Sequence, residues 1–192
     1  AKYIMGCNPI ALAIMKTPAA CGADVAVGEG QPLGMPLAYG GPYLGFMAPS
    51  AAMVRKLPGR IVGETVDADG QRAYVLTLQA REQHIRREKA SSNVCSNQAL
   101  CALTAAVYMS TMGPEGLKQA AVQSMSKAHY FAQRLAEIPG VQVQFGGQWF
   151  HEFVTTLPVS AEAVLHALDA ADILGGYPVE QGILWCVTEV VS

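Results

Sequence analysis

The chain has 192 residues, of which 51% are hydrophobic and 15% are charged, and its formal net charge is −2. This composition suits one large or two small globular domains with a sizeable core. The slightly acidic balance excludes a broad basic face for nucleic acid. The odd set of five cysteines contains no CxxC pair, which is typical of reduced thiols. No apolar run reaches membrane-spanning length, so we expect a cytoplasmic protein that binds no membrane.

The first part of the chain predicts short strands separated by turns. A strand at Tyr3 to Met5 leads through Asn8-Pro9 into a short helix, because asparagine caps a helix and proline suits its first turn. A small buried strand at 22–27 precedes residues 28–42, which carry too many glycines and prolines for regular structure. The next expected elements are a strand at 43–47 and a helix at 49–57. This alternation of strands and helices favours an α/β layer.

The middle of the chain predicts a β-hairpin followed by long helices. Residues 60–66 and 73–78 flank an Asp-Gly corner at Asp69-Gly70, which is a strong hairpin signal. Helix is then expected from about residue 79 to residue 138, with breaks near 90–93 and at Met112-Gly113-Pro114. Because residues 94–112 are apolar on nearly every turn, we expect this part of the helix to be buried.

The last part of the chain predicts a second, smaller unit. We expect strands at 141–145, 150–157 and 183–188 and a helix at 161–171. The Gly-Pro interruption of the helical pattern places a domain boundary there. The predicted domains are therefore residues 1–113 and residues 114–192. Both ends of the chain are abrupt, and we expect truncation at both ends.

Charge is concentrated between Arg81 and Lys89, where seven of nine residues are ionisable. Glu82 and Arg86 lie four residues apart, so an ion-paired, solvated helix face explains this pattern. The polar run Ser91-Ser92-Asn93 follows directly and can cap the next helix. Since that helix is expected to be buried, the alternative is that the charged patch lines a pocket.

Other chemical motifs are weak or absent in the sequence. The glycines of Gly28 to Gly34 have GxGxxxG spacing and do not open an amphipathic helix, so a dinucleotide fingerprint is rejected. The four histidines lie far apart, without a cysteine or acid at ligand spacing, so no metal site is predicted. Cys95 and Cys101 fall on the predicted buried helix, where thiols usually serve packing.

Two long segments carry a family resemblance. They are GADVAVGEGQPLGMPLAYGGPYLGFMA and PGRIVGETVDADGQRAYVLTLQAREQHIRREKASSNVCSNQAL, about a third of the chain. Together they closely resemble the first-subunit half of the P-protein family of the glycine cleavage system, glycine dehydrogenase (decarboxylating). The resemblance implies an α/β, fold-type-I architecture of the pyridoxal-phosphate (PLP)-dependent transferases. Residues 1–113 would be the end of the large domain, and residues 114–192 the small C-terminal α/β domain.

The resemblance also implies a function. In that family, glycine is decarboxylated through PLP and its aminomethyl group passes to the lipoyl group of the H-protein. The cofactor supplies the electron sink, and the protein supplies binding and orientation. The expected partners are a second P-protein subunit that bears the Schiff-base lysine and the lipoyl H-protein. We expect a heterodimer subunit in glycine catabolism that is inactive in isolation.

One departure from the lysine-bearing half of the family concerns the cofactor anchor. Alignment on Gly40-Gly41-Pro42 places Gln31 at the Schiff-base lysine, and no lysine occurs between Lys16 and Lys56. This chain is therefore expected not to bind PLP covalently, although the complex uses it.

The resemblance leaves supporting roles for this chain. The pocket candidates are Arg86, Ser91, Asn93 and Glu29. Arg87 and Lys89 have no assigned role, and helix capping explains Ser91 and Asn93 equally well. The alternative function is a non-catalytic structural module that supports the lysine-bearing subunit.

Overall fold

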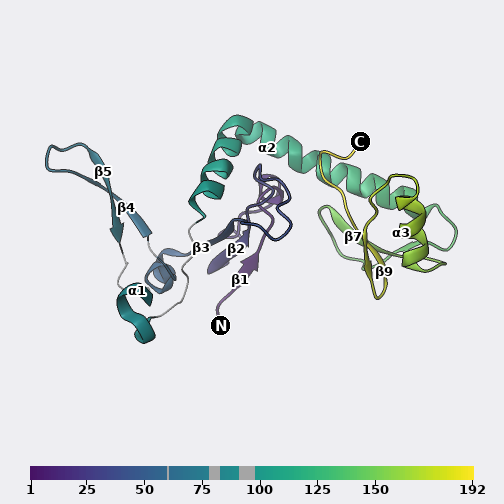
Figure 1. The fold of residues 1–192 in the computed structure, drawn as a ribbon, viewed down its shortest axis with the longest axis horizontal. Helices are drawn as coiled ribbons and strands as arrows, with labels where there is room; N and C mark the ends of the chain where they lie inside the picture. Colours follow the sequence, from purple (N-terminus) through teal and green to yellow (C-terminus); the bar gives the residue numbers. More distant parts are fainter. Residues whose placement is uncertain (60, 78–82, 91–97) are drawn as a thin grey trace. The chain divides into compact units, whose positions relative to one another are not determined.

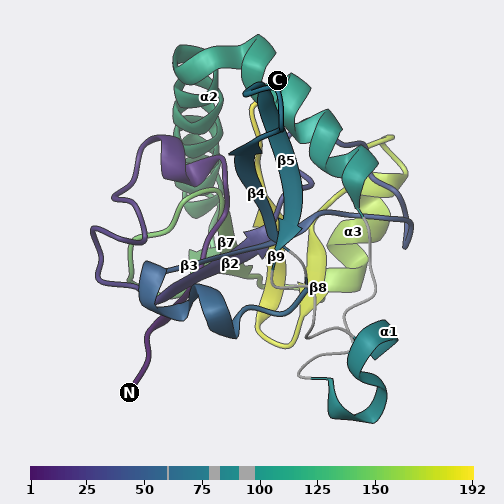
Figure 2. The same cartoon turned by 90° about the vertical axis from the view of Figure 1, so that its left-hand side faces the viewer.

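The computed structural model describes residues 1–59, 61–77, 83–90 and 98–192 (Figures 1 and 2). The contacts between residues divide the chain into two compact units. Unit 1 comprises Ala1–Pro9 and Lys16–Tyr108, and unit 2 comprises Ile10–Met15 and Met109–Ser192.

Unit 1 is built on a three-stranded sheet of order β1-β2-β3. Strand β1 (Ile4–Gly6) pairs in parallel with β2 (Val25–Glu29), and β2 pairs in antiparallel fashion with β3 (Gly45–Pro49). The three strands confirm the predicted ones, with their bounds shifted by one to three residues. The helix predicted after β1 is one turn of 3-10 helix, η1 (Ala11–Ala13), which belongs to unit 2. The helix predicted after β3 is the 3-10 helix η2 (Ala51–Lys56) of unit 1.

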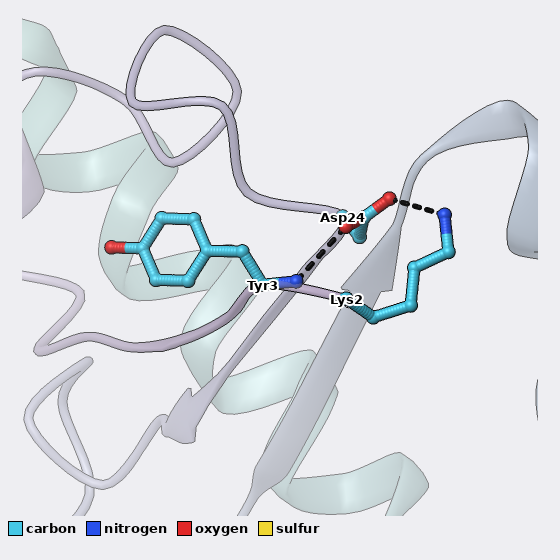
Figure 3. Close-up of polar contacts among 3 residues, drawn as sticks. All are labelled: Lys2, Tyr3 and Asp24. Carbon is cyan, nitrogen blue, oxygen red and sulfur yellow. Dashed lines mark hydrogen bonds and ion pairs between the residues drawn. The ribbon is translucent and has the colours of Figure 1, made fainter.

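Asp24, directly before β2, fixes the start of β1 (Figure 3). Its carboxylate accepts hydrogen bonds from Lys2 Nζ at 2.7 Å and from the backbone N–H of Tyr3 at 2.9 Å. The bond from Lys2 and then the bond from Tyr3 lower the pKa of Asp24. Because the folded-state pKa is depressed, this stabilisation is present above the unfolded-state pKa and is lost as the pH falls through the folded-state pKa.

The predicted β-hairpin is confirmed. Strands β4 (Ile61–Val66) and β5 (Arg72–Thr77) pair in antiparallel register from Ile61↔Thr77 to Val66↔Arg72. The Asp67 carboxylate closes the corner by accepting the backbone N–H groups of Asp69 and Gln71, each at 2.9 Å. Gly70 takes a φ of 75°, which a glycine adopts without steric cost.

Helices follow the hairpin as α1 (Gln83–Arg86), the 3-10 turn η4 (Arg87–Lys89) and α2 (Ala99–Ala136). The predicted break at Gly113-Pro114 is confirmed, since Gly113 has a non-helical φ of 62° inside α2. None of the helices among the described residues is long and apolar enough to span a membrane.

The predicted burial of the helix at 94–112 is wrong for its described part. Leu100, Leu103 and Val107 are 76%, 60% and 57% exposed, and only Ala105 is buried there. An apolar sequence shows that a face must be covered, but it does not show that the covering surface belongs to the same segment of chain.

Unit 2 contains an antiparallel four-stranded sheet of order β6-β7-β9-β8. Three strands match the predicted ones: β6 (Gln142–Val143), β7 (Glu152–Thr156) and β9 (Gly182–Cys186). The helix α3 (Ala161–Asp169) is also confirmed, and Ser160 Oγ caps it by accepting the N–H of Ala163 at 3.2 Å. The sequence analysis missed β8 (Tyr177–Val179), because a proline such as Pro178 argues against a strand. Proline is tolerated at the edge of a sheet, and β8 is an edge strand.

The main core of unit 2 lies between this sheet and the helices. Alternate residues of β7 and β9 supply Phe153, Ile183 and Trp185, and α2 supplies Ala128 and Ala132. Further apolar residues of α3, including Val164, Leu165 and Leu168, pack against this cluster. The one polar group of the Trp185 ring is satisfied, since its Nε1 donates to Thr155 Oγ1 at 2.8 Å.

Candidate functional site

The candidate site in unit 1 is the loop from Gly30 to Leu44, which leaves the end of β2 and returns to β3. The loop is closed at its base, where the N–H of Gly30 donates to the carbonyl of Leu44 at 2.7 Å. Glu29 reinforces this closure, because its Oε1 accepts the N–H of Gln31 at 3.1 Å and the N–H of Leu44 at 2.6 Å. The carboxylate of Glu29 therefore holds both ends of the loop together.

Gln31 occupies the position that the sequence aligned with the Schiff-base lysine. Its side-chain Nε2 donates to the carbonyl of Met35 at 2.7 Å, and the residue is partly buried. An amide nitrogen cannot form an imine, and this one stabilises the loop instead. The side chains of Glu29 and Gln31 therefore both bond to the backbone of the loop, and the pocket role of Glu29 stays a prediction.

The loop also lies against the first part of α2. An added Cβ at Gly34 would lie 2.8 Å from the side chain of Tyr108, and Cys101 Sγ lies 3.9 Å from the carbonyl oxygen of Pro42. Helix α2 begins at Ala99, six residues after Asn93. Because the N–H of Ala102 bonds to the carbonyl of Gln98 at the start of α2, the expected capping of this helix by Ser91 and Asn93 is wrong. It is α2 that packs on the loop of Gln31.

Of the other residues considered for the site, the structure describes Arg86 and Arg87 but not Ser91 and Asn93. Arg86 is the last residue of α1 and is exposed. Arg87 is exposed at the start of η4, with a φ of 52°. Ser91 and Asn93 lie outside the described residues, so their predicted pocket role stays a prediction.

Tyr43 is a loop residue that the sequence suggests could close the pocket, although core packing is the commoner role of an aromatic side chain beside glycine. Its hydroxyl accepts the N–H of Ala38 at 3.1 Å, which fastens the loop across its middle. Asparagine or aspartate would have been the usual sign of such a side-chain to backbone contact, and tyrosine gives no such signal.

A second cluster lies at one end of the β7–β9 pair in unit 2. The ligand atoms of His151, Glu152 and Cys186 all lie within 4.8 Å of one another. Burial and then the charge of Glu152 and its hydrogen bond raise the pKa of the Cys186 thiol to about 11. Burial lowers the pKa of His151, against the opposite effect of Glu152 and Glu189. The sequence missed this cluster because strand pairing, not sequence spacing, brings Cys186 beside Glu152.

An apolar hollow of about 540 Å³ lies elsewhere in unit 2, lined by Met15, Met125, His129, Gln148, Trp149 and Phe150. The rings of His129 and Trp149 stack with centroids 3.8 Å apart, and His129 Nε2 lies 3.2 Å from the carbonyl oxygen of Trp149. This histidine is therefore engaged in packing and hydrogen bonding within the hollow.

Mutation can separate two possible contributions of Glu29 to stability, which are the hydrogen bonds that close the loop and the negative charge of the carboxylate. Glu29→Ala removes the acceptor of two N–H groups, and we expect it to lower the free energy of unfolding by about 1 to 2 kcal/mol. Glu29→Gln keeps an Oε1 that accepts the same N–H groups, so we expect a loss below about 0.5 kcal/mol. Urea unfolding followed by far-ultraviolet circular dichroism measures both values. Equal losses in the two variants would show that the negative charge, not the loop closure, matters.

Solved structures of low sequence identity share the fold of this chain. A NifS-like protein from Rickettsia africae matches the whole chain with a TM-score of 0.62 at 12% identity, over 49% of its own length. Mouse CSAD in its apo form matches the whole chain with a TM-score of 0.61 at 11% identity, over 42% of its length. The chain therefore has the α/β fold of the fold-type-I PLP-dependent enzymes, as predicted.

The chain belongs to the glycine cleavage system P-protein family, whose model matches residues 1–192. It is 51% identical over 193 aligned residues to the probable glycine dehydrogenase (decarboxylating) subunit 1 of Desulfitobacterium hafniense. It is 54% identical over 190 aligned residues to the protein of the same name from Moorella thermoacetica. These alignments cover 97% and 95% of this chain, but 43% of each relative, so the chain spans less than half of their length.

A crystal structure from the same family matches the chain closely. It is that of glycine decarboxylase (P-protein) of the glycine cleavage system in an inhibitor-bound form, with a TM-score of 0.94 and 45% identity. The match covers 100% of this chain and 45% of the P-protein chain. The predicted family is confirmed by these findings.

Proposed function

We propose that this chain is a portion of subunit 1 of a two-subunit glycine dehydrogenase (decarboxylating), the P-protein of the glycine cleavage system. In this role it assists glycine decarboxylation and transfer of the aminomethyl group to the lipoyl H-protein. The observation that carries the proposal is Gln31, which sits in the loop after β2 with its amide bonded to the carbonyl of Met35. The subunit would work in the cytoplasm beside a second subunit that supplies the Schiff-base lysine.

The residues of this chain fit a supporting place near PLP, and they do not fit covalent attachment. When bound to the complex, PLP supplies an electron sink for the loss of carboxylate. Position 31 carries an amide, and no lysine occurs between Lys16 and Lys56. The candidates for non-covalent contacts are Ser91 and Asn93, whose hydroxyl and amide groups suit a phosphate, and Arg86, whose guanidinium suits a phosphate or a carboxylate.

The packing of the loop on α2 supports this assignment of roles. Tyr108 at Gly34 and Cys101 at Pro42 join the Gln31 loop to the helix that follows Ser91 and Asn93. We also propose that residues 1–113 are the end of the PLP-fold large domain and that residues 114–192 are its small C-terminal domain.

Reconstitution tests the proposal. A chimeric subunit 1, in which this chain replaces the matching segment of the Moorella thermoacetica relative, is mixed with the lysine-bearing subunit and lipoyl H-protein. We expect glycine-dependent CO2 exchange from the mixture and none from the chimera alone. Borohydride reduction with PLP should label the lysine-bearing subunit and leave position 31 unlabelled.

Single substitutions in the chimera test the site. We expect the exchange rate to fall about tenfold in each of three variants, Arg86→Ala, Ser91→Ala and Asn93→Ala. A tenfold loss corresponds to about 1.4 kcal/mol, the free energy expected from one missing contact to a charged group. Arg134→Ala is the matched control, because Arg134 is exposed and pairs with Glu137, the residue that directly follows α2. If the mixture is active but indifferent to all three substitutions, the chain is a structural module, and the site assignment is wrong. Glycine turnover by the chimera without its partner would contradict the whole proposal.

A further inference from the structure

The cluster of His151, Glu152 and Cys186 has no place in the proposed function. Each residue offers one ligand atom of a different kind: an imidazole nitrogen, a carboxylate oxygen and a sulfur. The three atoms lie within 4.8 Å of one another, and His151 is half-buried while Glu152 and Cys186 are exposed. Mixed nitrogen, oxygen and sulfur ligands are the set that Zn²⁺ takes in proteins.

The backbone beneath the cluster is held by strand pairing. Glu152 and Cys186 are register partners in the antiparallel β7–β9 pair. The ladder continues past them, because the N–H of Val187 donates to the carbonyl of His151 at 3.0 Å. Successive side chains of a strand point to opposite faces, but His151 precedes β7 in a bend, which lets its ring join the side chains of Glu152 and Cys186.

We propose that His151, Glu152 and Cys186 form a binding site for Zn²⁺ that joins the ends of β7 and β9. A neutral imidazole, a carboxylate and a thiolate balance the charge of the ion, and the thiol proton passes to water when the Zn–S bond forms. Zinc bonds of about 2.0 to 2.3 Å in a tetrahedron place ligand atoms roughly 3.3 to 3.7 Å apart. The three ligand atoms lie within 4.8 Å of one another, so side-chain movements of roughly 1 Å or less bring them to these separations.

Three protein ligands leave one position of the tetrahedron for water or a fourth residue. Glu189 lies close enough for its charge to act on His151. Its carboxylate accepts a hydrogen bond from Ser124 Oγ at 3.3 Å, so its place is also defined. The site is thus expected to stabilise unit 2 by fastening the end of the β7–β9 pair.

Titration of the metal-free chain with Co²⁺ tests the site, because a cobalt–thiolate bond gives a charge-transfer absorption band that cobalt bound by nitrogen and oxygen lacks. We expect one equivalent of Co²⁺ to produce the band and Zn²⁺ to abolish it by displacement. Zn²⁺ should also raise the midpoint of thermal unfolding. Cys186→Ser should remove the band, and His151→Ala should weaken binding at least tenfold.

Matched controls come from the same chain. Cys21 is an exposed free cysteine of unit 1, and Cys21→Ser should leave the band unchanged. His166→Ala removes a histidine of α3 that is not part of the cluster and should also have no effect. Circular dichroism checks that each variant is folded.

A measurement on the unmodified chain covers the case in which Cys186→Ser fails to fold. Zn²⁺ should slow alkylation of Cys186 at least tenfold, and it should leave Cys21 unaffected, as read by mass spectrometry of the labelled peptides. The proposal is overturned if stoichiometric Co²⁺ gives no thiolate band, if Cys21→Ser removes the band, or if Zn²⁺ leaves the alkylation of Cys186 unchanged.

Discussion

Gly182→Ala is expected to lower the free energy of unfolding by roughly 3 kcal/mol or more, from overpacking and from backbone strain. An added Cβ would lie 2.0 Å from the carbonyl oxygen of Thr155 and 3.1 Å from Cα of Thr156. Both atoms belong to the backbone of β7, so the clash cannot be relieved by turning a side chain. Gly182 also has a φ of 145°, which is unfavourable for any residue with a Cβ.

Tryptophan fluorescence during urea unfolding measures this effect, because both tryptophans, Trp149 and Trp185, belong to unit 2. Gly146→Ala is the matched control. Nothing lies within 4 Å of an added Cβ there, and its φ is not positive, so we expect a change within about 0.5 kcal/mol. A Gly182→Ala variant as stable as the Gly146→Ala variant would contradict the observed approach of β9 to β7.

Ile183→Ala should lower the free energy of unfolding by about 2 to 5 kcal/mol, and Ile183→Val by about 0.5 to 1.5 kcal/mol. Ile183 is 0% exposed and belongs to the core cluster with Phe153 and Trp185. Removal of three carbons there leaves a cavity, because a paired strand cannot move inward to fill it.

Leu184→Ala is the control for Ile183→Ala. Leu184 is the next residue of β9, only partly buried, and its side chain points to the opposite face of the sheet. We expect a loss below about 1.5 kcal/mol, measured by the same tryptophan fluorescence. If Leu184→Ala costs as much as Ile183→Ala, the core of unit 2 does not lie on the face assigned to it.

Local signals in the sequence predicted most of the elements. The Asp-Gly corner at Asp69-Gly70 predicted the β4–β5 hairpin, because few residues other than glycine take the φ that the corner needs. Gly113-Pro114 predicted the break in α2, since proline removes a helical hydrogen bond. Strand β8 was missed because its stability comes from pairing with β9, and its own sequence contains an unfavourable proline.

The candidate site also combines features that the sequence predicted with features that only the structure shows. The sequence alone shows glutamine, not lysine, at position 31. An amide cannot form an imine whatever surrounds it, so this feature does not depend on the tertiary structure. The bonds of Glu29 to the N–H groups of Gln31 and Leu44 join residues up to 15 positions apart, and only the folded loop shows them.

The sequence by itself determined the family, the order of the elements and the missing amine, because these depend on residue identity and local backbone preference. Tertiary structure alone decided that His151 and Glu152 meet Cys186, and that Leu100 and Leu103 are exposed. The physical reason is that strand register and surface coverage depend on which distant segments pair, and a local pattern of residues does not specify its partner.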